Sequence, residues 1–206
     1  MSWKSETLFH ESGLDFRFDN RWIIRKYDEH TYYRGLSSAG LKAVDFIGIY
    51  QDTRAVFIEV KNYGQRSPKK AEEILLDPDP FIERMLKKIT DTRIGIRAIH
   101  GYFSRNWIYR LLYPRLINLP LRNWNRASWV FWAQLYHRVC EKQELEVIFC
   151  LEFLDSYEGV PHEVQKAAIH KITTVLMQGS EAGKQQVRVL INLMDKDSSE
   201  SFFNPF

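Results

Sequence analysis

The chain has 206 residues, of which 45% are hydrophobic and 27% are charged, and its formal net charge is +3. This composition is typical of a globular protein and excludes intrinsic disorder. A disulfide framework is excluded because the chain has only two cysteines, Cys140 and Cys150. A membrane-spanning helix is excluded because the longest uncharged run, 127–136, is shorter than the ~20 residues that such a helix needs. The N-terminal residues carry no apolar secretion signal, so we expect a single cytoplasmic domain over 1–206.

The pattern of apolar residues in the first hundred positions predicts a short helix, three strands and a longer helix. In chain order these are a helix over 6–11, a strand over 21–33 interrupted around 28–30, a hairpin of strands over 42–50 and 55–63, and a helix over 80–100. Loops are expected over 36–40 and 64–70. Asp79-Pro80 marks the start of the longer helix, because proline is favoured at the first helical position.

The second half of the chain predicts a helical insertion followed by a strand, a helix and a last strand. The insertion covers 101–140, the strands cover 146–154 and 187–194, and the helix runs from Pro161 to about Gln178. The strand over 146–154 is almost entirely apolar, which is typical of burial on both faces. The chain is therefore expected to be a mixed α/β sandwich.

Positive charge is concentrated in one segment, residues 92–140, which contains no acidic residue. It holds eight arginines: Arg93, Arg97, Arg105, Arg110, Arg115, Arg122, Arg126 and Arg138. Removing those eight from the 29 basic residues leaves 21 against 26 acidic residues, so the rest of the chain carries −5. Four of the six tryptophans also lie there, and arginine with aromatic rings suits phosphate contact and base stacking. Packing of the aromatics in a core, and contact with an anionic membrane surface, are the alternatives.

The hairpin contains the candidate chemistry: Asp45 on one strand and Glu59 and Lys61 on the other. Because alternate strand residues share a face, packing of the neighbouring apolar residues in a core brings the three side chains onto one surface patch. In an antiparallel hairpin, the residue numbers of two directly opposed residues add up to the same value along both strands. This sum must be 104 or 106 to place Asp45 opposite Glu59 or Lys61. The connection must therefore have an odd number of residues, or contain a bulge.

Two close carboxylates repel each other unless a cation lies between them, and their oxygens are ligands that Mg²⁺ or Mn²⁺ prefers. The backbone carbonyl of Val60 is a further candidate ligand, and Lys61 is placed to orient a water or to stabilise charge on a phosphate. A Glu-x-Lys pair alone more commonly marks a solvated strand face.

The segments 42–49 and 56–63 resemble the core of the PD-(D/E)xK nuclease superfamily, although Val44 stands where that pattern has proline. The resemblance implies a restriction-endonuclease-like fold: a mixed β-sheet core flanked by helices, with the Arg/Trp-rich stretch as a helical insertion. It also implies that Asp45 and Glu59 bind Mg²⁺ (or Mn²⁺) and that Lys61 is catalytic. Members often add a glutamate from the first helix, for which Glu11 is the candidate, with Glu6 and Asp28 as alternatives.

The expected function is divalent-metal-dependent hydrolysis of phosphodiesters, with DNA favoured over RNA because DNA is the commoner substrate in that superfamily. Candidate nucleic-acid contacts are Lys42, Arg66, Arg105, Arg110, Arg122 and Arg126. One alternative is a non-catalytic nucleic-acid-binding or assembly subunit with the same fold. Another is that the Arg/Trp segment docks onto a protein partner or membrane, and a homodimer or partner subunit is also open.

Overall fold

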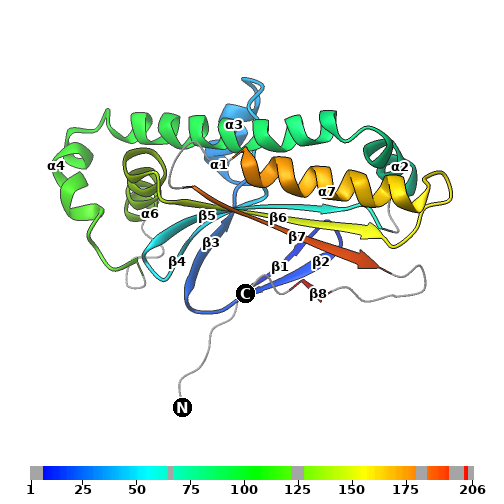
Figure 1. Cartoon of the computed structure of the whole chain (residues 1–206). Helices are drawn as coiled ribbons and strands as arrows, with labels where there is room; N and C mark the ends of the chain where they lie inside the picture. Colours follow the sequence, from blue (N-terminus) through cyan, green and yellow to red (C-terminus); the bar gives the residue numbers. More distant parts are fainter. Residues whose placement is uncertain (1–6, 65–66, 122–127, 180–184, 195–201, 204–206) are drawn as a thin grey trace, which may run out of the picture.

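The computed structural model describes residues 7–64, 67–121, 128–179, 185–194 and 202–203. It is built in layers, with a five-stranded sheet in the middle, helices on one face and a small second sheet on the other (Figure 1). The expected mixed α/β architecture is confirmed. Within the described residues, no helix is long and apolar enough to cross a membrane.

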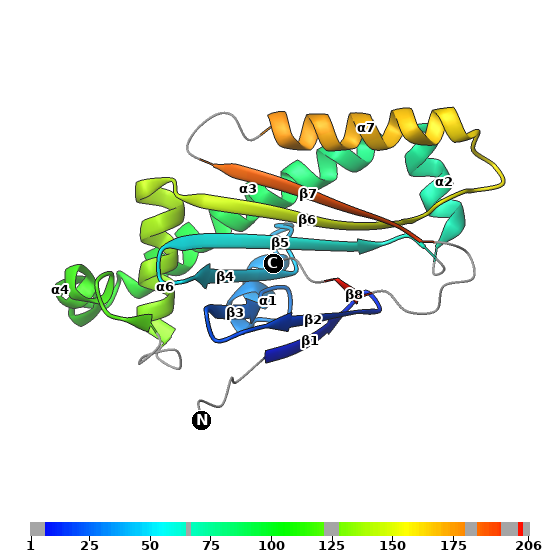
Figure 2. The same cartoon turned by 60° about the horizontal axis from the view of Figure 1, so that its bottom comes forward.

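The central sheet has the strand order β3-β4-β5-β6-β7 (Figure 2). Its strands are β3 (Trp22–Lys26), β4 (Phe46–Tyr50), β5 (Arg54–Asn62), β6 (Leu145–Leu154) and β7 (Gln186–Met194). The first three are antiparallel neighbours, whereas β5, β6 and β7 are parallel. Parallel neighbours need crossover connections, and the helices that supply them cover one face of the sheet.

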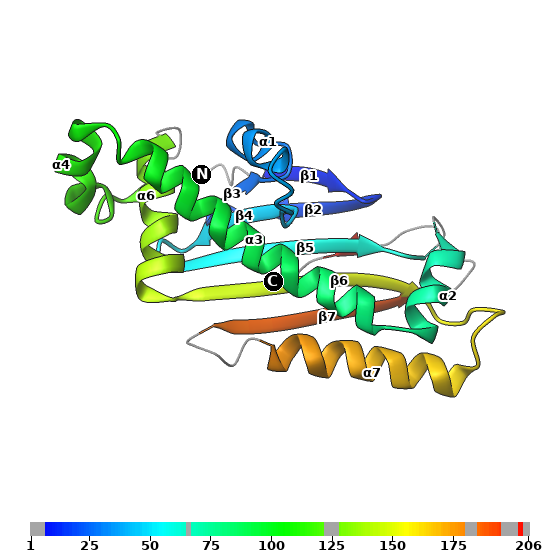
Figure 3. The same ribbon diagram turned by 90° about the horizontal axis from the view of Figure 1, so that it is seen from above.

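Helices of very different length form the layer above the sheet. They are α1 (Thr31–Ser37), α2 (Pro68–Leu76), α3 (Asp79–Phe103), α4 (Trp107–Leu116), α6 (Ser128–Tyr136) and α7 (His162–Gln178), with a π-helical segment η1 (His137–Lys142) after α6. The 25-residue α3 runs obliquely across the sheet (Figure 3). The expected loops over 36–40 and 64–70 are partly wrong, because α1 extends into the first and α2 begins within the second.

The helix predicted over 6–11 is wrong for residues 7–11, which begin a small sheet instead, while residue 6 lies outside the described residues. Strand β1 (Thr7–Glu11) pairs antiparallel with β2 (Leu14–Phe18), which also pairs with β8 (Phe202–Phe203). The two residues between β1 and β2, Ser12 and Gly13, both have positive φ, as a tight hairpin turn requires. The apolar residues of β2 alternate with polar ones, and this period of two, which indicates a strand, explains the difference.

The predicted hairpin is present in the predicted phase. Phe46 pairs with Ile58 and Tyr50 with Arg54, which gives an index sum of 104, and three residues connect the strands. The connection therefore has an odd number of residues, as is needed for Asp45 and Glu59 to lie on the same face of the sheet. The first strand is shorter than expected, since residues 42–45 precede β4 rather than belonging to it.

The central sheet separates two apolar cores. On the helix side, Phe57 packs with side chains of α3, α6 and α7, whereas Val56, Ile58 and Val60 face the small sheet. Strand β6 is buried along its whole length, which confirms the expectation for its apolar run. Because both faces of β5 are covered between Ala55 and Val60, a polar side chain in this part of the strand, such as that of Glu59, lies inside the protein.

The described parts of the 101–140 segment, 101–121 and 128–140, pack on the helix-side core, and part of their aromatic content is structural. Tyr109 and Trp132 are fully buried, and the Tyr136 ring stacks on His100 with centroids 3.7 Å apart. Trp107 is different, since 64% of it is exposed. Packing therefore accounts for most of the described rings of this segment, while Tyr102 on α3 and Trp107 on α4 are exposed.

Candidate functional site

The segment that carries Asp45 is fixed to the long helix by two hydrogen bonds. The Asp91 carboxylate accepts one from the Lys42 backbone N–H at 2.9 Å, and the Thr92 hydroxyl accepts one from the Val44 N–H at 3.1 Å. Asp91 and Thr92 are both buried in α3. These bonds satisfy backbone donors that lie outside the sheet and set the height of Asp45 relative to α3.

Asp45 itself is held from both neighbouring strands. Its carbonyl accepts a hydrogen bond from the Tyr27 N–H at 2.8 Å, and its Oδ2 accepts one from the Val60 N–H at 2.7 Å. Continuing the β4–β5 register by one residue places Asp45 opposite Glu59. The two predicted acids therefore lie opposite each other on neighbouring segments of the hairpin, on the helix side of the sheet.

Lys61 completes the predicted constellation. Its Nζ lies 2.6 Å from Glu59 Oε1, 3.7 Å from Asp45 Oδ2 and 2.6 Å from the Val60 carbonyl oxygen. These are the three groups expected to bind a metal ion. The lysine ammonium thus contacts the whole predicted ligand set.

A second lysine, which the sequence analysis missed, enters the cluster from α3. Lys88 Nζ lies 2.6 Å from Glu59 Oε1 and 3.9 Å from Asp45 Oδ1. Lys88 falls on the same stripe of the helix as Met85 and Thr92, both buried. A lysine within an otherwise apolar helix stripe is the signal by which it can be found in the sequence.

The two acids of the cluster are buried, so the expected surface patch is wrong for them, whereas the side chains of Lys61 and Lys88 are 24% and 20% exposed. Glu59 has no exposed surface and Asp45 is 5% exposed, because α3 covers this face of β5. Burial and the nearby Asp45 carboxylate raise the pKa of Glu59, despite the two lysines. Burial alone would lower the pKa of Lys61, but Glu59 and Asp45 outweigh it and raise that pKa.

The donor chemistry of this cluster fits a hard divalent cation. Asp45, Glu59 and the Val60 carbonyl offer oxygen ligands, and Glu59 Oε2 is buried without a hydrogen-bond partner among the described residues. A buried carboxylate oxygen without a partner is costly, and a bound cation would satisfy it. Within the described part of the chain, no group of three or more His, Cys, Asp or Glu side chains is arranged to hold a metal ion.

The candidate third acid, Glu11, lies at the end of β1 and pairs with Lys26 at 2.9 Å. Asp28 is also near the cluster: its pKa is raised to about 6 by burial and by the Asp45 and Glu11 carboxylates, and its Oδ1 is buried without a partner among the described residues. The remaining alternative, Glu6, lies outside the described residues. The structure therefore brings Asp45, Glu59 and Lys61 together and leaves Glu11 bound to another lysine.

The predicted nucleic-acid contacts are separated from this cluster. Arg105 and Arg110 are exposed, but they follow Phe103 at the end of α3, about 22 Å along the helix from Lys88. Lys42 is exposed three residues before Asp45. The other three candidates, Arg66, Arg122 and Arg126, lie outside the described residues.

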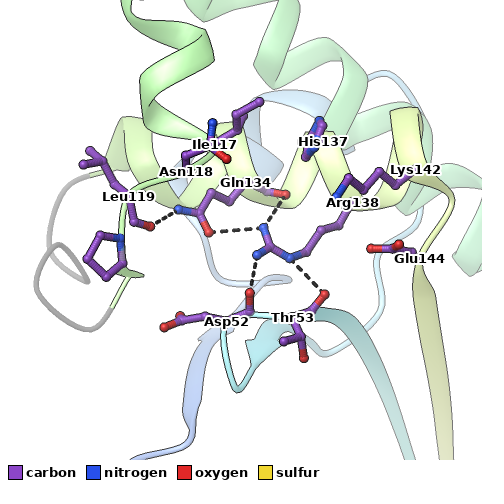
Figure 4. A pocket seen from close by; sticks show the side chains of 11 residues that line it. Asp52, Thr53, Ile117, Asn118, Leu119, Gln134, His137, Arg138, Lys142 and Glu144 are labelled. Carbon is purple, nitrogen blue, oxygen red and sulfur yellow. Dashed lines mark hydrogen bonds between the residues drawn. The ribbon is translucent and has the colours of Figure 1, made fainter.

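A cavity of about 540 Å³ lies at the opposite end of the hairpin, beside the β4–β5 connection, and Figure 4 shows its lining. Arg138 projects from η1 toward this connection and donates hydrogen bonds to the carbonyls of Asp52 and Thr53, and also to Gln134 (Figure 4). The hydrogen bonds of its guanidinium therefore stabilise the β4–β5 turn. This arginine of the basic segment is structural.

The site therefore consists of two buried acids and two partly exposed lysines between the central sheet and α3, and the exposed Arg105 and Arg110 lie beyond the end of α3. Comparisons with protein-family models, with curated proteins and with solved structures gave no match. The functional argument therefore depends on the residues themselves.

Proposed function

We propose that this chain is a divalent-metal-dependent nuclease with a PD-(D/E)xK centre on a restriction-endonuclease-like fold, and that it hydrolyses phosphodiester bonds in DNA. The observation that supports this most is the meeting of Asp45, Glu59 and Lys61. Asp45 precedes β4 while Glu59 and Lys61 lie on β5, yet the Lys61 ammonium contacts both carboxylates. The hairpin register that the sequence required for this meeting is also the one observed.

The proposed reaction adds water to phosphorus and breaks one P–O ester bond, which yields a phosphomonoester and a free hydroxyl. A divalent cation, Mg²⁺ or Mn²⁺, would polarise the phosphate and lower the pKa of the water. Asp45, Glu59 and the Val60 carbonyl would hold that cation. Lys61 would orient the water or stabilise the negative charge on the phosphate, since its ammonium lies beside both acids.

Two further features of the chain are consistent with a nucleic-acid substrate. Exposed Arg105 and Arg110 lie in a segment without acidic residues, and guanidinium groups bind phosphate well. Their distance from Asp45 means that they would contact phosphates away from the cleaved bond. They would thus contribute to affinity and not to the chemical step.

The test is cleavage of plasmid DNA, linear duplex, single-stranded DNA and RNA, each with Mg²⁺, Mn²⁺ or EDTA. Asp45→Asn and Lys61→Ala should abolish cleavage and spare nucleic-acid binding. Asp79→Asn and Lys166→Ala are matched controls, because both residues are exposed on helices away from the cluster, and these variants should cleave normally. Cleavage that persists undiminished in both site variants would exclude the assignment.

A second candidate function is a non-catalytic nucleic-acid-binding subunit. It is favoured by one observation: Lys61 and Lys88 together balance the charges of Asp45 and Glu59, so the fold needs no metal ion for neutrality. Such a protein would bind nucleic acid and would cleave none of the four substrates with either metal. The same assay therefore separates the two candidates.

A further inference from the structure

One oxygen atom in the cluster receives two ammonium groups. Lys61 Nζ and Lys88 Nζ each lie 2.6 Å from Glu59 Oε1, while Glu59 Oε2 has no partner among the described residues. Lys88 is also the group that approaches Asp45 Oδ1, at 3.9 Å. The two lysines thus divide the Asp45 oxygens between them and share a single oxygen of Glu59.

The charges of this cluster balance without a metal ion. Two carboxylates and two ammonium groups sum to zero, and a divalent cation added beside them leaves an excess of +2. Charges repel strongly where burial limits screening, and Glu59 has no exposed surface. Even when the nearby Asp28 carboxylate is counted, the excess would be +1, so withdrawal of one ammonium would favour entry of the divalent cation.

Lys88 is better placed to withdraw than Lys61. The two lysine side chains are similarly exposed, Lys88 by 20% and Lys61 by 24%, but Lys88 comes from α3, a different layer from the strand that carries both Glu59 and Lys61. Lys61 also donates a 2.6 Å hydrogen bond to the Val60 carbonyl, which ties it to its own strand. A lysine on a helix can release its ion pair and extend toward water by rotation of its side chain.

The helix that presents Lys88 is fixed relative to the acids. Asp91 and Thr92 lie three and four residues after Lys88, and their bonds to the backbone at Lys42 and Val44 join this turn of α3 to the segment that ends in Asp45. Because this turn of α3 is fixed, the Lys88 ammonium can return to Glu59 and Asp45 whenever the site holds no divalent cation.

We propose that Lys88 is a built-in competitor for the metal site: it occupies Glu59 and Asp45 until a divalent cation displaces its ammonium, and it thereby weakens and sets the metal affinity. This inference rests on the proposed function to the extent that Asp45 and Glu59 bind the cation. It adds a regulatory property, because the site would load only at cation concentrations that overcome the lysine.

The experiment measures Mn²⁺ binding by titration calorimetry on the full chain, without substrate. Lys88→Met and Lys88→Gln should bind Mn²⁺ at least about tenfold more tightly than the wild type, the lower end of what one nearby charge does to a buried ionic equilibrium. Lys87→Met is the matched control, since Lys87 is the adjacent lysine but pairs with Asp91 at 2.7 Å. It should bind as the wild type does, and Asp45→Asn should bind weakly or not at all.

The charge of residue 88 is separated from its packing by Lys88→Arg, which keeps the positive charge and should keep the wild-type affinity. Circular dichroism and urea unfolding show whether each variant is folded. Lys88→Met keeps the unbranched shape of the lysine side chain, and Lys88→Gln keeps a polar end group. Equal Mn²⁺ affinity in the wild type and both neutral variants would overturn the competition and leave the metal site intact. Failure of every variant to bind Mn²⁺ would overturn both proposals.

Discussion

Gly95 lies where α3 passes over the segment that leads into the candidate site, and it offers a sensitive test of this packing. A methyl group built at position 95 would overlap the Tyr27 hydroxyl, with Leu36 Cδ1 at 3.4 Å as the next contact. Tyr27 is 1% exposed, and its backbone N–H donates to the Asp45 carbonyl. Substitution by alanine therefore presses on a side chain that is tied to the site.

The expected sign follows from two opposing magnitudes. Alanine is favoured over glycine in a helix by about 1 kcal/mol, whereas overpacking a buried site typically costs about 1–3 kcal/mol. Gly95→Ala should thus lower the free energy of unfolding by about 1 kcal/mol. Tyr27→Phe removes the overlapping atom, and the ring Cζ, which would then be the nearest Tyr27 atom, is 3.7 Å from the new methyl. In that background Gly95→Ala should become stabilising by about 1 kcal/mol.

Urea unfolding of the four proteins in this cycle measures the coupling directly. We expect a coupling energy of about 2 kcal/mol, well above the ~0.5 kcal/mol scatter of independent sites. Tyr27→Phe alone should change little, because the hydroxyl has no hydrogen-bond partner among the described residues. Gly101→Ala is the control, since a methyl at this exposed position of α3 meets no atom within 4 Å and should only stabilise. The reasoning fails if Gly95→Ala stabilises the wild type as Gly101→Ala does.

Three other predictions concern the charged groups. The pKa of Asp28 is raised to about 6 from its ordinary 3.8, so the folded state holds this proton more tightly, and the contribution of Asp28 to stability falls as pH rises from about 4 to 6. Asp28→Asn should remove that fall, of order 1 kcal/mol for a half-buried group, in unfolding curves measured across this pH range. Arg138→Met should lower the unfolding free energy by about 2–4 kcal/mol, because the Asp52 and Thr53 carbonyls lose their donor, whereas exposed Arg110→Met should change it little. Arg105→Glu with Arg110→Glu should weaken DNA binding and flatten its log–log salt dependence by about 0.9 per lost phosphate contact; an unchanged slope in fluorescence titrations would show that Arg105 and Arg110 do not contact DNA.

The hairpin of the candidate site was predictable because strand geometry has few degrees of freedom. Once the apolar residues on either side of Asp45 and Glu59 are placed in a core, the period of two fixes both the face and the parity of the register. The same period of two is present in residues 14–18, where apolar and polar residues alternate, and it indicates a strand there. The helix expected over 6–11 is wrong for residues 7–11, because the Ser12-Gly13 turn joins two extended segments into a hairpin.

Contacts between layers were not predictable in the same way, because they depend on where a helix lies and how it is rotated. Lys88 is separated from Glu59 by 29 positions and belongs to another element. The sequence shows only that Lys88, Asp91 and Thr92 interrupt an apolar helix face; each has a specific partner in the fold, which is Glu59, the Lys42 N–H and the Val44 N–H respectively. Polar residues on such a face are therefore the first positions to examine for contacts with a strand beneath.

The position of α3 also decides what the candidate site can do. If Asp45, Glu59 and Lys61 lay on an open strand face, water would solvate their charges and salt ions would screen them. A cation could then bind or leave with little effect on the stability of the fold. Beneath α3, Glu59 has no exposed surface, so every change of charge beside it must be balanced by a group within reach. Lys61 and Lys88 provide that balance, and a ligand that enters must exchange with one of them. The availability of the two carboxylates is thus governed by the helix above them as much as by the hairpin that carries them.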